Sequence, residues 1–133
     1  MKMENTIQKF IEPIKKDECR KLGIPENFIF GVHGYRKELL GGFCEPIIEN
    51  GKLIAVDIGI DEEKKSIGMK KSFFHEIKHA QQYFKYGYEE VHHINPVYYE
   101  LEATLYEHKR YLEECIHYIS KKLKQCIISL ISK

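Results

Sequence analysis

The sequence predicts an α+β fold, in which a small, mostly antiparallel sheet combines with an N-terminal helix, a central helix and a long C-terminal helix. Two observations lead to this prediction. Apolar residues recur at helical spacing in separate segments, and short extended runs bounded by glycine-containing turns lie between the first two of these segments. The 133 residues are enough for one hydrophobic core, so a single domain spanning residues 1–133 is expected.

The first predicted helix covers residues 5–22. Ile7 and Ile11 lie on one stripe of it, which is typical of a helix that buries one side. Pro13 is expected to kink or divide this helix, because proline lacks a backbone N–H and its ring clashes with the preceding turn. Gly23 is expected to end it.

Three extended segments are expected next, at residues 28–30, 43–48 and 53–60. Asn50 and Gly51 separate the last two, and both residues tolerate the positive φ of a type I′ turn. The last two segments therefore predict a β-hairpin.

The central helix is expected to run from Ser66, as its N-cap, to about Tyr86, with Gly87 as the residue that ends it. A short linker then leads to Asn95 and Pro96, which suit the N-cap and the first position of the long C-terminal helix. The residues of the central helix that are expected to face the core are Phe73, Ile77, Ala80 and Phe84.

The last part of the C-terminal helix carries an apolar stripe whose members are alternately four and three residues apart, which is typical of a helical seam. Three arrangements fit this stripe: docking on the core of the same chain, association as a homo-oligomer, or covering the candidate site so that the protein is latent. The members of the stripe are Leu112, Ile116, Ile119, Leu123, Cys126 and Leu130.

Charge and composition argue against several kinds of partner. The chain has 21 Lys and Arg residues against 20 Asp and Glu residues, and its formal net charge is +1. Nucleic acid is not expected as a partner, because phosphate binding needs a clustered basic surface. No signal peptide and no contact with a membrane are expected, and four cysteines without C-x-x-C spacing favour free thiols in a cytoplasmic protein.

The motif that carries chemistry is the run His75-Glu76-Ile77-Lys78-His79 in the central helix. Residues four apart lie on the same side of a helix, so the two imidazoles can bind one ion at about 2.0–2.1 Å. Glu76 lies beside that site without being a ligand. From there it can take a proton from metal-bound water and return it to a leaving amine. The motif therefore predicts the active-site helix of a zinc hydrolase.

A catalytic zinc ion needs a third protein ligand. Glu100 and Glu102 occur near the start of the C-terminal helix and point to different sides of it, so only one of them can face the metal. Glu100 is favoured because its side of the helix continues through Thr104 and Glu107. Glu102 stays the alternative.

The His-Glu-x-x-His motif and the downstream Glu-x-Glu-Ala pattern together resemble the gluzincin metallopeptidases, including small single-domain members called minigluzincins. The resemblance covers residues 53–107 and implies a zinc-dependent hydrolase that cleaves peptide bonds in a peptide or protein substrate. It implies Zn²⁺ as cofactor. The expected site residues are the metal ligands His75, His79 and Glu100 and the catalytic residue Glu76.

The resemblance carries three further expectations. In such peptidases the substrate main chain pairs with an edge strand above the metal, a position in which residues 53–60 would stand unless they form an ordinary buried strand. The family often has Asp four residues after the third ligand, where this chain has Thr104, so support for the ligands is expected to be weaker or built differently. A Tyr or His near the cleft could bind the oxyanion; the candidates are Tyr86, Tyr88, His92, His93, Tyr98 and Tyr99.

The main alternative is a metal-stabilised binding or regulatory module that holds the same zinc ion without catalysis. Nothing in the sequence separates this class from an enzyme, because ligands and general base would be the same residues.

Overall fold

The computed structural model describes residues 6–35, 42–61 and 66–132. It has the predicted α+β class, with a small sheet, an N-terminal helical segment and a long C-terminal helix. In chain order, the elements are α1 (Thr6–Phe10), α2 (Glu12–Leu22), the 3-10 turn η1 (Glu26–Phe28), β1 (Ile29–Tyr35), β2 (Gly42–Glu49), β3 (Lys52–Asp61), α3 (Ser66–Tyr86), the π-helical segment η2 (Glu90–Ile94) and α4 (Pro96–Ile131).

The predicted N-terminal helix consists of two pieces, α1 and α2, that meet at Ile11. Pro13 lies in the first turn of α2, where its missing N–H costs nothing, whereas it would break one continuous helix. Gly23 ends α2 with a φ of 70°, as expected, and its N–H and that of Ile24 bond to carbonyls of the last turn. Residue 5, the expected start of this helix, lies outside the described residues.

The sheet has the strand order β1-β3-β2. Strands β2 and β3 form the predicted hairpin, and Asn50 and Gly51 have φ values of 52° and 76°, the positive values that a type I′ turn requires. Strand β1 pairs with β3 in parallel. The sheet is therefore mixed, with one antiparallel and one parallel pair.

Of the two alternatives for residues 53–60, the ordinary buried strand is correct and the edge strand open to substrate is not. They belong to β3, which is hydrogen-bonded to a strand on each side. The physical reason lies in their composition: Val56, Ile58 and Ile60 have no exposed surface, as is typical of a strand in the middle of a core. Among the described strands, β2 is the one that pairs with β3 alone and also lies next to α3.

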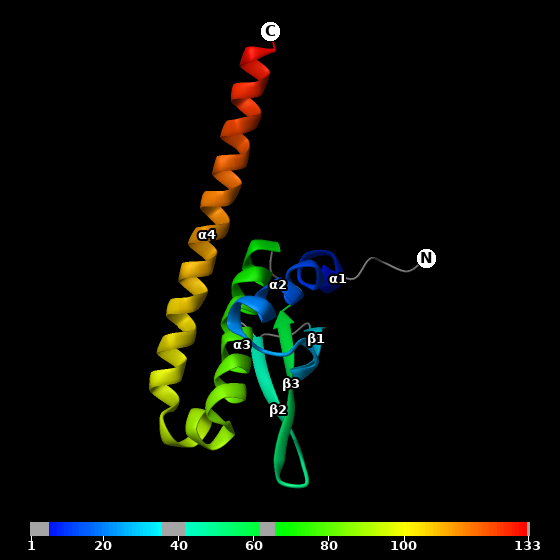
Figure 1. Cartoon of the computed structure of the whole chain (residues 1–133), viewed down its shortest axis with the longest axis vertical. Coiled ribbons are helices and arrows are strands. Elements are labelled where there is room, and N and C mark those ends of the chain that lie inside the picture. The colour runs from blue at the N-terminus through cyan, green and yellow to red at the C-terminus, as the bar shows by residue number, and fades with distance from the viewer. Residues whose placement is uncertain (1–5, 36–41, 62–65, 133) are drawn as a thin grey trace, which may run out of the picture.

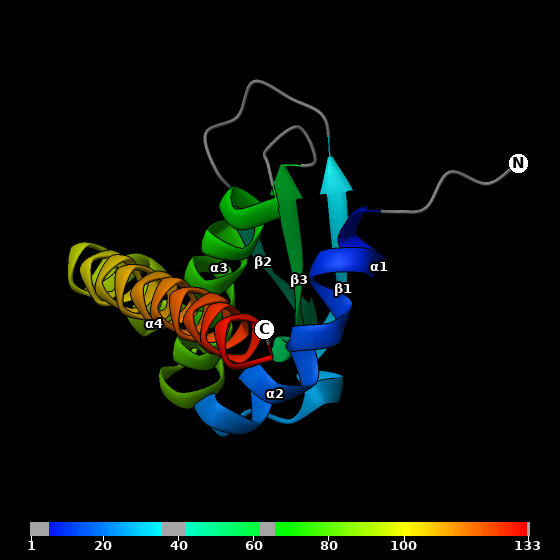
Figure 2. The same ribbon diagram turned by 90° about the horizontal axis from the view of Figure 1, so that it is seen from above.

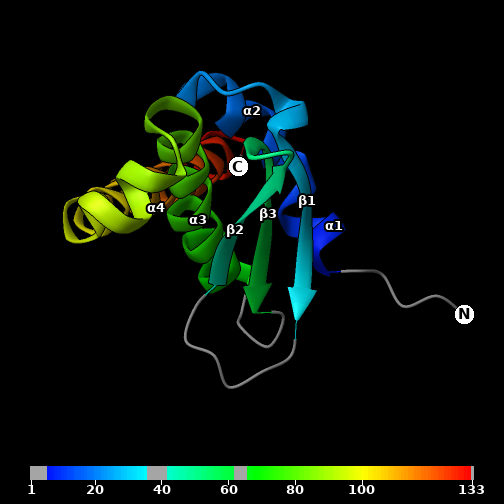
Figure 3. The ribbon, with the colours of Figure 1, turned by 90° about the horizontal axis from the view of Figure 1, so that it is seen from below.

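Helices α1, α2 and α3 cover one face of the sheet, and α4 packs on the outer side of α3 (Figure 2 and Figure 3). On that face, the β-branched side chains of β3 pack with Phe73, Phe74 and Ile77 of α3. On the opposite face the ring of Phe43 lies over Gly59, where a Cβ atom would come within 2.1 Å of the ring. Gly59 is therefore required by packing.

Helix α3 has the predicted extent and orientation. Phe73, Ile77 and Ala80 have no exposed surface, whereas Phe84 is 48% exposed and packs its edge on Phe28. Gly87 follows the helix with a φ of 86° and donates its N–H to the carbonyl of residue 83. The side chain of Ser66, the expected N-cap, lies outside what the structure describes.

The expected linker between the two long helices is itself helical over η2. Asn95 does not cap α4 with its side chain; its amide instead donates to Glu90 across η2, at 2.7 Å. Pro96 occupies the first turn of α4, as predicted. The carboxylate of Glu90 also accepts a hydrogen bond from the hydroxyl of Tyr99, and its backbone carbonyl accepts from the N–H of Asn95.

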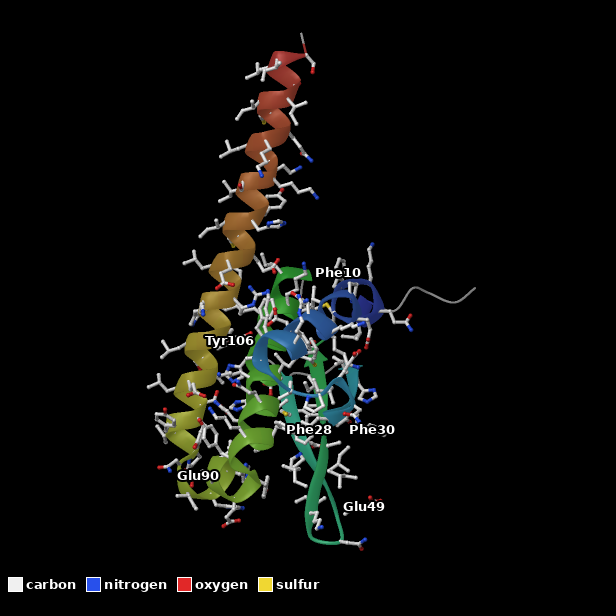
Figure 4. The ribbon with its side chains drawn as sticks, in the orientation of Figure 1. Phe10, Phe28, Phe30, Glu49, Glu90 and Tyr106 are labelled. Carbon is white, nitrogen blue, oxygen red and sulfur yellow. The ribbon has the colours of Figure 1, made fainter. Side chains whose placement is uncertain are left out.

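The first half of α4 packs on α3, where Ala103 has no exposed surface, so the two helices approach closely. The second half extends beyond the rest of the molecule (Figure 1 and Figure 4). All described side chains from Ile116 to Ser132 are exposed, so docking of this segment on the core of the same chain is wrong. In the described part of the chain, no helix is both long and apolar enough to cross a lipid bilayer.

Candidate metal centre

Helices α3 and α4 bring the three predicted ligands together. The Nε2 atom of His75 lies 2.8 Å from Oε1 of Glu100, and the Nε2 atom of His79 lies 3.0 Å from its Oε2. The two Nε2 atoms are 3.2 Å apart. The spacing of four along α3 aligns the two rings, and the tight packing at Ala103 brings the first turns of α4 within reach.

These separations suit a zinc ion. Three ligand atoms about 2.0–2.1 Å from a tetrahedral zinc ion lie about 3.3 Å from one another, close to the distances in the protein. Two imidazoles and one glutamate are the ligand set of one class of catalytic zinc sites. The side chain of Glu100 is 59% exposed and those of the two histidines are 14% exposed, so the site is open on one side.

Gln82 determines which nitrogen of His79 faces the site. Its amide Nε2 donates to the carbonyl of Tyr99 and to Glu102, so its Oε1 is the atom that lies 2.8 Å from Nδ1 of His79. Because an amide oxygen only accepts, the proton of the neutral ring lies on Nδ1 and the Nε2 lone pair points into the site. Burial lowers the pKa of His79, which favours the neutral ring.

Glu107 determines which nitrogen of His75 faces the site. Its Oε1 accepts from Nδ1 of His75 at 2.9 Å, and its other oxygen lies 3.5 Å from Nζ of Lys71. Thr104, at the position where the family often has Asp, turns its hydroxyl back to the carbonyl of Glu100 instead. Support for the ligands is thus built differently, from a carboxylate one helical turn further along α4.

The orientation of both rings directs their Nε2 atoms toward the carboxylate of Glu100. Two nitrogen lone pairs and a carboxylate converge within a space in which the possible ligand atoms all lie within 4.8 Å of one another. Acceptors at this spacing repel unless a proton or a metal ion lies between them. The donor set therefore fits a divalent metal ion.

The alternative third ligand, Glu102, is directed elsewhere. Its carboxylate accepts from Gln82 at 3.0 Å and lies 3.7 Å from Nζ of Lys78. The 200° between positions 100 and 102 on a helix separates the two carboxylates, so that only Glu100 lies beside both histidines.

Glu76 lies in the same cavity, with 6% of its surface exposed. Burial raises the pKa of Glu76 to about 8, and the negative charges of Glu100 and Glu107 add to the effect. Strand β2 passes directly over this residue: a side chain at Gly42 would meet the carbonyl of Gly59 at 2.5 Å and Cγ of Glu76 at 3.1 Å. Gly42 thus allows the strand to approach the carboxylate.

The cavity has a volume of about 950 Å³. One wall comes from β2, through Gly42 and Cys44, and another from the first turns of α4. Ser72 and Tyr83 of α3 line it too. No described residue beyond Glu107 lines the cavity, so in the single chain the apolar stripe from Leu112 onward does not cover the site.

Of the six aromatic residues considered for an oxyanion-binding role, His92 is the one that lines the cavity. Tyr88 stacks on its ring at 4.9 Å, and the hydroxyl of Tyr99 bonds to Glu90. Tyr83, which was not among these six residues, lines the cavity, whereas the other five candidates do not. Burial raises the pKa of Tyr83, so this hydroxyl keeps its proton.

Sequence reasoning missed the roles of Gln82 and Glu107. Gln82 lies three residues after His79, and Glu107 lies seven residues after Glu100 on the same side of α4. Both spacings put a polar side chain one or two turns from a ligand, which is the signal that could have found them. The choice of ring that each one contacts depends on how the two helices pack.

The fold and the site define an α+β protein with a candidate three-ligand metal centre between two packed helices. In comparisons with known protein families, curated proteins and solved structures, nothing matches the chain.

Proposed function

We propose that this protein is a minimal zinc peptidase of gluzincin type, in which His75, His79 and Glu100 hold Zn²⁺ and Glu76 is the general base. The observation that carries the proposal is the convergence of the three ligand atoms, with the other nitrogen of each ring already engaged by a hydrogen-bond acceptor. A buried carboxylate in the same cavity adds the group that hydrolysis needs.

When bound, a zinc ion polarises a peptide carbonyl and lowers the pKa of water beside it. Glu76 accepts a proton from the attacking water and delivers it to the leaving amine. Tyr83 and His92, which line the cavity, are in position to donate to the oxygen that becomes negative as the carbonyl is attacked. Gln82 and Glu107 hold the two rings in the orientation that presents Nε2.

Strand β2 is the proposed platform for the substrate main chain. In the described sheet it pairs with β3 alone, and its first residues, Gly42 and Cys44, line the cavity. An extended peptide that adds to a sheet edge gains main-chain hydrogen bonds independent of its sequence. A peptide or protein substrate therefore suits this site, with hydrolysis taking place in a single domain formed by residues 1–133.

The proposed compartment is the cytoplasm. All four cysteines are free, and three of them, Cys19, Cys44 and Cys115, are fully or partly buried. Free thiols are kept in this state by a reducing environment.

Four versions of the full-length chain test the proposal: the wild type and the variants Glu76→Gln, Glu100→Gln and Glu102→Gln. Zinc content is measured by elemental analysis after dialysis. We expect about one equivalent in the wild type, in Glu76→Gln and in Glu102→Gln, and a large loss in Glu100→Gln. The pair at positions 100 and 102 is matched, because each change removes one charge from the same turn of α4.

Activity is measured on a mixture of peptides from digested proteins, with new termini identified by mass spectrometry. We expect zinc-dependent cleavage by the wild type and a fall of at least about 100-fold in Glu76→Gln. A wild type that binds zinc but cuts nothing, and that does not differ from Glu76→Gln, would identify the metal-stabilised binding module instead. A wild type that retains no zinc would contradict both readings.

A further inference from the structure

The outer side of α4 carries an apolar stripe that Lys109 interrupts between Leu105 and Leu112. At 100° per residue, its members lie within about 40° of one line along the helix. Each of these side chains is between 55% and 70% exposed. We call them the α4 stripe: Leu101, Leu105, Leu112, Ile116, Ile119, Leu123, Ile127 and Leu130.

Most of the α4 stripe lies on the side of the helix away from the core, while Leu101 also lines the cavity of the candidate metal centre and Ile119 lines a second cavity beside the start of α3. The buried residues of α4, Tyr99, Ala103 and Arg110, lie about 140° around the helix from it. In Figure 4 the last turns of α4 extend beyond the other elements of the molecule. Folding of one chain therefore leaves the whole stripe exposed, on the described part of the molecule.

The size of the stripe matches a protein interface. Its eight aliphatic side chains offer roughly 800 Å² per copy, which is the area of one side of a standard interface. Contiguous apolar patches of this size are rare on proteins that stay monomeric.

The charges along α4 determine which partner suits the stripe. The acids of the helix lie at or before Glu114, and the residues that follow it contain lysines and no Asp or Glu. Glu113 and Lys124 flank the stripe on one side, at about 80° and 100° from its line, and Lys122 flanks it on the other side.

From these observations we propose that the α4 stripe is the interface of a homodimer in which two copies of α4 pack antiparallel. With the twofold axis between residues 117 and 118, three apolar layers form on each side of it: Ile116 faces Ile119 of the second copy, Leu112 faces Leu123, and Leu105 faces Leu130. Lys109 and Cys126 meet between the last two of these layers. This register follows from the alternating spacing of four and three.

The antiparallel direction also satisfies the charges. In antiparallel pairs, flanking positions on the same side of the seam meet, so Glu113 lies beside Lys124 of the second copy, twice per dimer. In a parallel dimer, opposite flanks meet and Lys124 would lie beside Lys122 of the second copy. Charge complementarity therefore selects the antiparallel arrangement of two copies.

The dimer is tested by light scattering on the full-length chain. We expect a mass twice the 15.8 kDa of one chain for the wild type. Leu123→Glu should give a monomer, because it places a charge in the stripe. Gln125→Glu, which adds the same charge on the other side of the helix, should stay a dimer. Both positions are exposed in the single chain, so neither change is expected to affect folding or zinc content.

The relative direction of the two α4 helices is tested by copper-catalysed oxidation of thiols to disulfides, in a chain that carries Cys115→Ser. In the antiparallel dimer, Cys126 faces position 109 of the second copy, so Lys109→Cys should give a covalent dimer, whereas the chain that keeps Lys109 should not. Cross-linking through Cys126 alone would mean a parallel pair and would overturn the proposal. A wild type that stays monomeric in light scattering would also overturn the proposal. The same holds for a monomeric wild type that binds to vesicles containing an anionic phospholipid.

Discussion

The two histidine rings of the candidate metal centre are oriented by different helices. Gln82 of α3 contacts His79, and Glu107 of α4 contacts His75. A neutral amide and a carboxylate are not equivalent partners, because a carboxylate raises the basicity of the imidazole more strongly. The orientation of the His75 ring therefore depends on the packing of α4 against α3 as well as on α3 itself.

Replacing Glu107 by Ala removes the acceptor of His75 Nδ1, and we expect the affinity for zinc to fall about 10- to 100-fold. Glu107→Gln keeps an acceptor oxygen without the charge and should cause a smaller loss. Zinc affinity is measured by competition with a chelating dye.

The matched control for this change is Glu49→Ala, an exposed acid on the hairpin. The free energy of unfolding of Glu107→Ala, measured in urea with a chelator present, shows whether Glu107 stabilises the fold as well as positioning His75. An affinity for zinc equal to that of the wild type would mean that Glu107 does not position His75.

At the residue scale, the local chemistry could be predicted and the contacts between helices could not. His75, Glu76 and His79 were found because their relation is set by the helix itself. Glu100 was preferred over Glu102 from its side of the helix, and the structure places it beside both rings. The partner of His75 could not be assigned from the sequence, since it depends on the axial position of α4 against α3.

A buried ion pair joins α2 to α4. Glu18 has no exposed surface, and its carboxylate accepts from the guanidinium of Arg110 and from the hydroxyl of Tyr106 at 2.6 Å. Arg110 also lies over the ring of Phe74, 4.8 Å from its centroid. These contacts hold the first half of α4 in place, and Tyr106 lies between α4 and the rest of the molecule (Figure 4).

Arg110→Met leaves the Glu18 carboxylate buried without its main partner, and we expect a loss of about 3–5 kcal/mol in the free energy of unfolding. The double variant Glu18→Leu, Arg110→Met should recover most of this loss, because it removes both charges. Urea denaturation of the chelator-treated protein measures both effects.

Arg20→Met is the control, because Arg20 pairs with Asp17 on the exposed side of α2 and surface pairs contribute little. A single Arg110→Met variant as stable as the wild type would show that the buried pair is not what fixes α4.

At the element scale, the helices and the hairpin follow from local signals. Asn50-Gly51 predicted the turn, Gly23 and Gly87 predicted two helix ends, and Pro13 predicted the division of the first helix. The parallel pairing of β1 could not be predicted, because it joins strands that are distant in sequence. The helical turn η2 was also missed, since its bond between Asn95 and Glu90 replaces the expected cap.

The molecule as a whole buries acidic groups that ionise at high pH. Burial raises the pKa of the Cys19 thiol to about 11 from an ordinary value of 9.0. Burial and the neighbouring Glu18 also raise the pKa of Tyr106. Between pH 9 and 11 the unfolded chain loses the thiol proton and the folded chain retains it, so the folded state binds more protons.

We therefore expect the free energy of unfolding to fall as the pH rises from about 9 to 11, and to be insensitive to this thiol below pH 9. Urea midpoints across this range, measured with a chelator present, test the effect. Cys19→Ala should have a shallower decline, whereas Cys126→Ala, at an exposed position, should follow the wild type. Equal slopes in all three proteins would contradict the assignment to Cys19.

The sequence alone determined the α+β class, most element boundaries and the two histidines with their glutamate, because each of these depends on residues within one or two turns of one another. Tertiary structure decided the central position of β3, the role of Glu107, the choice of Glu100 and the exposure of the α4 stripe. Each of these depends on where separate elements come to rest against one another, which spacing along one chain does not specify.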